Sequence, residues 1–165
     1  MSKAESENAE AEAYYNKGNA CYKLEQYAEA IVACEDAISI KADLAKAYCL
    51  MGIAHSDLEQ YAEAIAALKK YVALEPTREW ADIYLIMGDA YGNLELYDDA
   101  IAAIKKVIAL RPDFAEAYFG MGNAYSELEQ YAEAIAAYEM GIVLEPNGKD
   151  ADDARKRISE IENRD

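Results

Sequence analysis

The sequence predicts an all-α protein, an α-solenoid of antiparallel helix pairs, and three observations lead to this prediction. The octet LEQYAEAI occurs at Leu24–Ile31, Leu58–Ile65 and Leu128–Ile135, with a looser copy, LELYDDAI, at Leu94–Ile101. Apolar residues around each copy recur at helical rather than strand spacing. The 165 residues include only three prolines and eight glycines, a composition that favours helices over a turn-rich β fold. A solenoid explains both the helical spacing and the repetition.

Glycine sets the register of the repeats. Four of the eight glycines are separated by 34, 36 and 34 residues: Gly18, Gly52, Gly88 and Gly122. Tyrosine and alanine residues recur at fixed distances from these glycines, and a proline stands at the end of three of the repeats. We therefore expect a single repeat domain over residues 1–165. Its repeats are predicted at residues 11–44, 45–78, 79–114 and 115–148.

Each repeat is predicted to contain two helices. In the third repeat Tyr84, Met87, Tyr91 and Leu94 recur at i, i+3, i+7 and i+10, which is a helical stripe. A wider apolar stripe follows over residues 97–108 and predicts the second helix. Proline after a second helix prevents that helix from continuing. Small residues in the glycine and alanine columns would allow the two helices to pack closely.

The ends of the chain are predicted to differ from the repeats. Residues 149–163 have a thin apolar stripe on an otherwise charged segment, which predicts a C-terminal capping helix that covers the last repeat. The first ten residues are acidic and are expected to extend the first helix or to stay loose. They lack the apolar segment of a signal peptide.

Charge and composition exclude several functions. The formal net charge of −16 predicts that neither nucleic acid nor a membrane surface is a partner. His55 is the only histidine, no nucleotide-binding or hydrolase motif occurs, and we expect no enzyme activity, metal or cofactor. Cys21, Cys34 and Cys49 are odd in number and form no CxxC motif, so a reducing, cytoplasmic location is expected.

The runs YLIMGDAY and YFGMGNAY, the YAEAI start of the second helices and the LEP or LRP endings resemble the tetratricopeptide repeat family. The resemblance covers residues 11–148. It implies helix pairs stacked in a right-handed superhelix, with the first helices lining a concave groove that binds peptides or proteins. Tyr71 and Gly141 depart from the family by replacing a small alanine, and the longer spacing adds Glu79 and Trp80.

The resemblance also implies which residues face the groove. The expected contact residues are Tyr15, Asn19, Tyr22, Cys49, Leu50, Ile53, Asp82, Leu85, Ile86, Asp89, Phe119 and Asn123. Six of them are expected to form an exposed apolar band, unless neighbouring helices cover some of them: Tyr15, Leu50, Ile53, Leu85, Ile86 and Phe119. Carboxylates flank this band and would meet Lys or Arg of a ligand: Asp57, Asp82, Asp89, Glu116 and Glu127.

These features predict a protein- or peptide-binding scaffold that captures an amphipathic, basic and apolar segment. The acidic tails of large chaperones are excluded as ligands. Of the five places that clamp such tails in the family only Asn19 keeps a suitable side chain, and Asp82 would repel the carboxylate. Two alternatives stay open. The protein could self-associate through the groove or the terminal helix, or it could be a designed or consensus-derived scaffold without a natural ligand.

Overall fold

The computed structural model describes residues 2–76 and 80–164, and within these ranges every regular element is an α-helix. The all-α prediction is therefore confirmed. The described residues form two compact units, which we call unit 1 (Met1–Arg78) and unit 2 (Glu79–Asp165). Of the two extra residues in the third repeat, Glu79 lies outside the described residues, whereas Trp80 is buried in unit 2.

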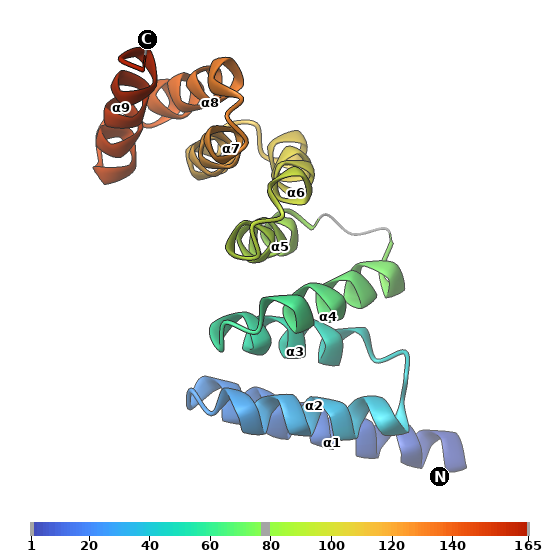
Figure 1. Ribbon diagram of the computed structural model, residues 1–165. Coiled ribbons are helices and arrows are strands. Elements are labelled where there is room, and N and C mark those ends of the chain that lie inside the picture. The colour runs from blue at the N-terminus through green and yellow to red at the C-terminus, as the bar shows by residue number, and fades with distance from the viewer. Residues whose placement is uncertain (1, 77–79, 165) are drawn as a thin grey trace. The chain divides into compact units, whose positions relative to one another are not determined.

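Unit 1 contains two helix pairs (Figure 1). Its helices are α1 (Lys3–Lys23), α2 (Tyr27–Ile40), α3 (Ala45–Asp57) and α4 (Tyr61–Leu74). Each helix packs against the next, and α1 also contacts α3, so the first helices of the two pairs are neighbours. The acidic N-terminal residues belong to α1, which starts with a capping box: the Ser2 hydroxyl accepts from the Glu5 N–H at 3.2 Å, and the Glu5 carboxylate accepts from the Ser2 N–H at 2.6 Å.

Unit 2 contains two further pairs and a terminal helix (Figure 1). Its helices are α5 (Ala81–Asn93), α6 (Tyr97–Leu110), α7 (Ala115–Glu127), α8 (Tyr131–Leu144) and α9 (Lys149–Glu162). Helix α5 contacts α7 as α1 contacts α3, and α9 packs on both α7 and α8. Ala151 and Ala154 are the buried residues of α9, whose other positions are mostly exposed.

The two helices of a pair approach each other closely, which explains why a glycine recurs at the same place in each repeat. A Cβ atom added at Gly122 on α7 would lie 2.5 Å from the ring of Tyr138 on α8, one of the most deeply buried side chains. The glycine leaves the space that the tyrosine ring fills, so backbone and ring can make van der Waals contact.

Gly141 on α8 is explained in the same way. A Cβ atom at Gly141 would lie 2.5 Å from the ring of Phe119 on α7. The fourth repeat thus combines a large residue on its first helix with a glycine on its second helix. This packing compensates the loss of about 1 kcal/mol of helix propensity that glycine brings relative to alanine.

The repeated octet forms the turn between the two helices of a pair. In the first copy Leu24 caps α1, and Glu25 adopts a left-handed conformation with φ of 60°. The Gln26 N–H donates to the Cys21 carbonyl at 3.0 Å, and the Glu25 N–H donates to the Tyr22 carbonyl at 2.9 Å, which is a Schellman motif. The left-handed conformation recurs with φ of 58–59° in the other copies, at Glu59, Glu95 and Glu129.

Replacing these glutamates with glycine is expected to stabilise the protein. A left-handed conformation costs a residue with a side chain about 1–2 kcal/mol, and the extra backbone entropy of glycine offsets about 0.5–1 kcal/mol of the gain. We expect Glu95→Gly and Glu129→Gly each to raise the free energy of unfolding of unit 2 by about 0.5–1 kcal/mol. Urea titration followed by fluorescence of Trp80, the only tryptophan, measures this change. Glu139→Gly, at an exposed position inside α8, is the control and should destabilise by about 1 kcal/mol.

Candidate functional site

The predicted contact residues fall into two groups, one in each unit. Helices α1 and α3 of unit 1 provide Tyr15, Asn19, Tyr22, Cys49, Leu50 and Ile53. Helices α5 and α7 of unit 2 provide Asp82, Leu85, Ile86, Asp89, Phe119 and Asn123. All twelve therefore lie on the first helix of a pair, and each group comes from two first helices that contact each other.

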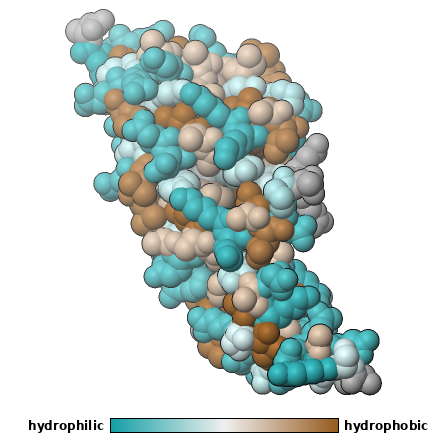
Figure 2. All heavy atoms as spheres, turned by 90° about the vertical axis from the view of Figure 1, so that its right-hand side faces the viewer, coloured by the Kyte–Doolittle hydropathy of each residue, from teal (hydrophilic) through white to brown (hydrophobic). Residues whose placement is uncertain are grey.

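The expected exposed apolar band is wrong at two of its six residues. Leu50 and Phe119 are only 8% and 7% exposed. Leu50 packs with residues of α1 and α2, such as Ala11 and Cys34, because α3 contacts both helices of the preceding pair. Phe119 packs with Tyr138 of α8 and with alanines of α9. The other four residues of the band are half-buried. On the face drawn in Figure 2, hydrophobic residues lie among hydrophilic ones.

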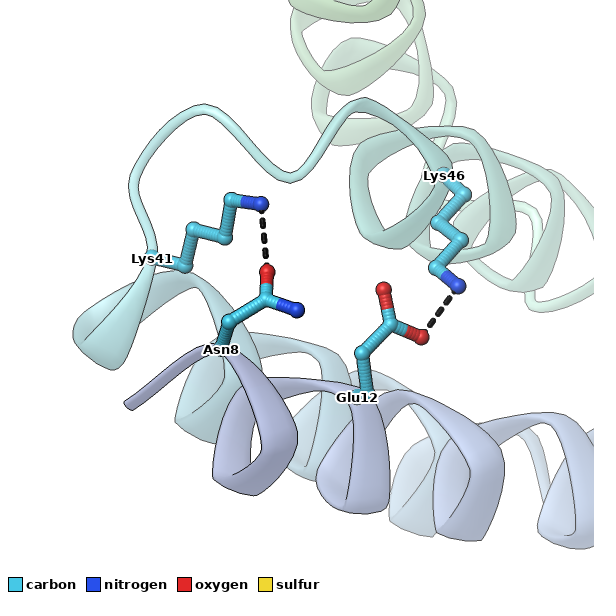
Figure 3. A network of polar contacts seen from close by, with 4 residues as sticks. All are labelled: Asn8, Glu12, Lys41 and Lys46. Atoms are coloured by element: carbon cyan, nitrogen blue, oxygen red, sulfur yellow. Dashed lines mark hydrogen bonds and ion pairs between the residues drawn. The ribbon is translucent and has the colours of Figure 1, made fainter. Parts of the chain in front are cut away.

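In unit 1 the polar residues of α1 and α3 bind one another. The Lys46 ammonium of α3 pairs with the Glu12 carboxylate of α1 (Figure 3) and lies 4.4 Å from the centre of the Tyr15 ring. At the other end of the two helices the Tyr22 hydroxyl donates to the Asp57 carboxylate at 2.6 Å. We call these contacts the α1–α3 pairs. Glu12 and Lys46 are thus ion-paired within the chain, and the Asp57 carboxylate accepts a hydrogen bond from Tyr22.

The Tyr22–Asp57 pair also affects ionisation. Partial burial, then the hydrogen bond to Asp57 and the negative charge of that carboxylate, raise the pKa of Tyr22 to about 12. The hydroxyl therefore stays protonated, and keeps donating its hydrogen bond, to a higher pH than an ordinary tyrosine would.

Unit 2 lacks the α1–α3 pairs because two residues differ at the matching positions. Counted from the glycine of each repeat, Glu116 takes the place of Lys46, and Gly92 takes the place of Tyr22. Asp82, which corresponds to Glu12, instead pairs with Arg111 at 2.7 Å. Asp82 thus takes its cation from Arg111 at the end of α6, and Glu116 adds a carboxylate where unit 1 has a lysine.

A hollow of about 550 Å³ occupies the space between α5, α6 and α7. It is lined by Gly88, Asp89, Gly92, Asn93, Tyr97, Ala100, Ile104, Gly120, Asn123, Ala124 and Glu127. The missing side chain at Gly92 keeps it open, since a Cβ atom there would meet no other heavy atom within 4 Å. Of the predicted contact residues, Asp89 and Asn123 line the hollow.

The carboxylates in and beside the hollow form no ion pair among the described residues, although Glu127 also lines a smaller hollow of about 240 Å³ with Arg157 and Arg164. Among the described residues, Asp89, Glu116 and Glu127 make no side-chain hydrogen bond or ion pair with one another or with any cation. Asp89 is exposed, yet partial desolvation raises the pKa of its carboxyl, and the negative charge of Glu116 adds to the rise. The site is therefore electrostatically suited to a cationic group.

Neighbouring amides are held in place around these carboxylates. The Tyr138 hydroxyl donates to Asn123 Oδ1 at 2.8 Å, and Asn93 Nδ2 donates to the Asp89 carbonyl at 2.9 Å. The first bond connects Asn123, which lines the hollow, to Tyr138 in the core of unit 2. The second leaves Asn93 Oδ1 as an acceptor beside Asp89. The hollow therefore contains hydrogen-bond acceptors from both α5 and α7.

His55 and Cys34 have structural roles. His55 Nδ1 lies 2.7 Å from Gln60 Oε1 and braces the turn after α3, as expected for a scaffold residue. Burial, followed by the nearby Cys49, raises the pKa of the Cys34 thiol to about 12, which makes the thiol unreactive at neutral pH. Within residues 2–76 and 80–164 no cluster of three or more His, Cys, Asp or Glu side chains could hold a metal ion, and no helix could cross a membrane.

Sequence reasoning missed Gly92, Gly120 and Tyr97 as part of the site. The sequence indicates Tyr97 only as the start of the stripe that predicts a second helix. The two glycines are not among the four that set the register of the repeats. A glycine on the groove-facing side of a first helix is itself a sequence signal, because it removes a side chain from a surface that the other repeats cover. Gly92 and Gly120 both fit this description.

Comparison with protein families identifies tetratricopeptide repeats along the chain. Tetratricopeptide repeat models match residues 11–43, 115–147 and 45–78, and a TPR repeat model matches residues 88–129. Comparison with curated protein sequences gives no significant match.

Solved structures show the same fold. A crystal structure of MamA is 25% identical, with a TM-score of 0.79, covering 92% of this chain and 84% of that one. MamA from Desulfovibrio magneticus RS-1, residues 41 to the end, is 22% identical, with a TM-score of 0.77 and coverage of 93% and 95%. YrrB, described as a TPR protein with an unusual peptide-binding site, is 22% identical, with a TM-score of 0.78 and coverage of 98% and 84%. With its four helix pairs and its repeat-model matches, the chain belongs to the tetratricopeptide repeat family.

Proposed function

We propose that this protein is a non-catalytic interaction scaffold that captures an amphipathic, basic and apolar peptide segment on the groove-facing side of its first helices. The family and the fold support a protein-interaction scaffold. The observation that carries the finer proposal is the hollow of unit 2, where carboxylates of α5 and α7 lack a cationic partner among the described residues.

The lining of the hollow supports an amphipathic ligand. Ala100 and Ile104 of α6 line the hollow with apolar side chains that are only 2% and 4% exposed, and Asp89 and Glu127 add negative charge. Apolar groups of a ligand would gain about 25 cal/mol per Å² of surface buried in the hollow, and basic groups would gain from charge complementarity. The net charge of −16 would also steer basic segments toward the protein from a distance.

YrrB provides a structural precedent for peptide binding by a chain of this fold. Since the likeness to YrrB concerns the fold alone, the charge and volume of the hollow are what favour the basic and apolar ligand. We also propose a reducing, cytoplasmic location, because the odd number of cysteines and the lack of a CxxC motif argue against a disulfide framework.

Selection from a random peptide display library on the immobilised full chain tests the proposed function. We expect selected peptides to combine Lys or Arg with apolar residues at helical or alternating spacing, and to bind more weakly as salt increases. Peptides without basic residues, or no selected peptide at all, would contradict the proposal. Sedimentation of the same sample is the control for the self-assembly alternative, because a dimer that occupies the groove would prevent selection.

A further inference from the structure

The hollow of unit 2 also indicates one residue type in the partner segment, an inference that rests on the proposed function. We propose that the hollow of unit 2 is a pocket for a single arginine side chain of the partner segment. Its guanidinium would lie between Asp89 of α5 and Glu127 of α7, and its aliphatic part would lie on Ala100 and Ile104 of α6.

The two units differ at the position of Lys46. In unit 1 the cation between the first helices comes from the chain itself, since Lys46 pairs with Glu12 and lies over Tyr15. In unit 2 the matching residue is Glu116, so a second carboxylate takes the place of the cation. Asp82 takes its cation from Arg111, but Asp89, Glu116 and Glu127 form no ion pair among the described residues, so a basic group from a partner would supply the positive charge beside them.

Gly92 leaves room for such a group. Tyr22 fills the matching position of unit 1 and binds Asp57, whereas Gly92 leaves that position open in unit 2. The resulting hollow of about 550 Å³ is larger than one side chain and can also admit part of the partner's backbone. An uncharged apolar side chain would fit the volume, but it would desolvate Asp89 and Glu127 without pairing them, which is unfavourable.

The arrangement of acceptors favours arginine over lysine. A guanidinium has five N–H donors in a plane and can bind acceptors on different sides at once, whereas an ammonium is a compact point charge. The acceptors here come from two helices and include the carboxylates of Asp89 and Glu127 and Oδ1 of Asn93. The half-buried Tyr97 also lines the hollow, and its aromatic ring suits a guanidinium that stacks.

NMR titration of the isotope-labelled full chain tests the pocket directly. The probes are Nα-acetyl-arginine methylamide, its lysine counterpart and its citrulline counterpart, which has the shape of arginine without the charge. We expect the arginine probe to shift the amide signals of Gly92, Gly120 and Asn123 saturably. The lysine probe should bind about fivefold more weakly or worse, and citrulline should cause no saturable shift.

Two variants make the test specific to the hollow. Gly92→Phe places a ring in the open space, and Asp89→Asn with Glu127→Gln removes both charges; each should abolish the saturable shifts. Shifts of equal size on α1 and α3, equal binding of lysine, or binding of citrulline would overturn the arginine pocket. Replacing arginine by citrulline in a selected peptide separates the two proposals. Unchanged affinity would reject the pocket and leave the proposed function intact, whereas failure to select any peptide would reject the function.

Discussion

Phe119→Ala is expected to lower the free energy of unfolding of unit 2 by about 3–5 kcal/mol. The ring is 7% exposed and packs against Tyr138 and against Ala151 and Ala154 of α9. Its removal would leave a cavity where α7, α8 and α9 meet, and the apolar contacts of the terminal helix would be lost with it. Although the sequence suggested this residue as a binding contact, its variant should report on folding.

Gly141→Ala should change the free energy of unfolding in opposite directions in the presence and in the absence of the Phe119 ring. Gly141→Ala alone would force a methyl group to 2.5 Å from the Phe119 ring. We expect it to destabilise by about 1–3 kcal/mol through overpacking, despite the better helix propensity of alanine. In the Phe119→Ala background the same change should stabilise by about 1 kcal/mol, because the methyl group enters an empty space and the propensity gain remains.

Urea unfolding of the four proteins in this cycle, followed by Trp80 fluorescence, measures the coupling. Trp80 is buried at the start of unit 2 and therefore reports on that unit. If Gly141→Ala destabilised equally with and without the Phe119 ring, the packing argument for Gly141 would be contradicted.

The helices could be predicted from the sequence because their signals are local. The octet encodes a helix end, a turn and a helix start within eight residues, and the glycine register repeats with the helix pairs. The bounds of α5, for example, follow from the stripe that includes Tyr84, Met87 and Tyr91. The local pattern alone, however, did not show that Glu25 and its counterparts adopt positive φ.

The candidate site was only partly predictable, because it depends on pairs of residues far apart in the chain. Sequence spacing placed Leu50 and Phe119 on the correct helices, but burial depended on which neighbours cover them. The pair between Glu12 and Lys46 joins residues from successive repeats, as does the pair between Tyr22 and Asp57. Unit 2 lacks these two pairs, which can be recognised only when both residues of each pair are compared with their counterparts in unit 2.

The second large effect concerns binding of a basic, apolar peptide. Neutralising Asp89 and Glu127 together, as Asp89→Asn and Glu127→Gln, is expected to weaken a selected peptide by about 10- to 100-fold, or about 1.4–2.7 kcal/mol. The variant removes the two carboxylates that line the hollow and keeps similar side-chain shapes. The fold should be retained, since neither carboxylate makes a hydrogen bond or ion pair with another described residue.

The matched control neutralises two carboxylates in unit 1, as Glu12→Gln and Asp57→Asn. It changes the net charge by the same amount, but these carboxylates already bind Lys46 and Tyr22 within the chain. Circular dichroism of both variants checks that the helices remain formed. Long-range attraction to the protein should therefore fall equally in the two variants, and only the local contact in unit 2 should differ.

The dissociation constants of one selected peptide for the wild type and these two variants test the central claim most directly. The claim is that the ligand's cation binds in the hollow of unit 2, beside the carboxylates of Asp89 and Glu127, which form no ion pair among the described residues. We expect the unit 2 variant to lose at least about tenfold in affinity, while the unit 1 variant stays within about threefold of the wild type. An equal loss in both variants would show that binding follows the net charge of the protein and would contradict the assignment of the hollow as the binding site.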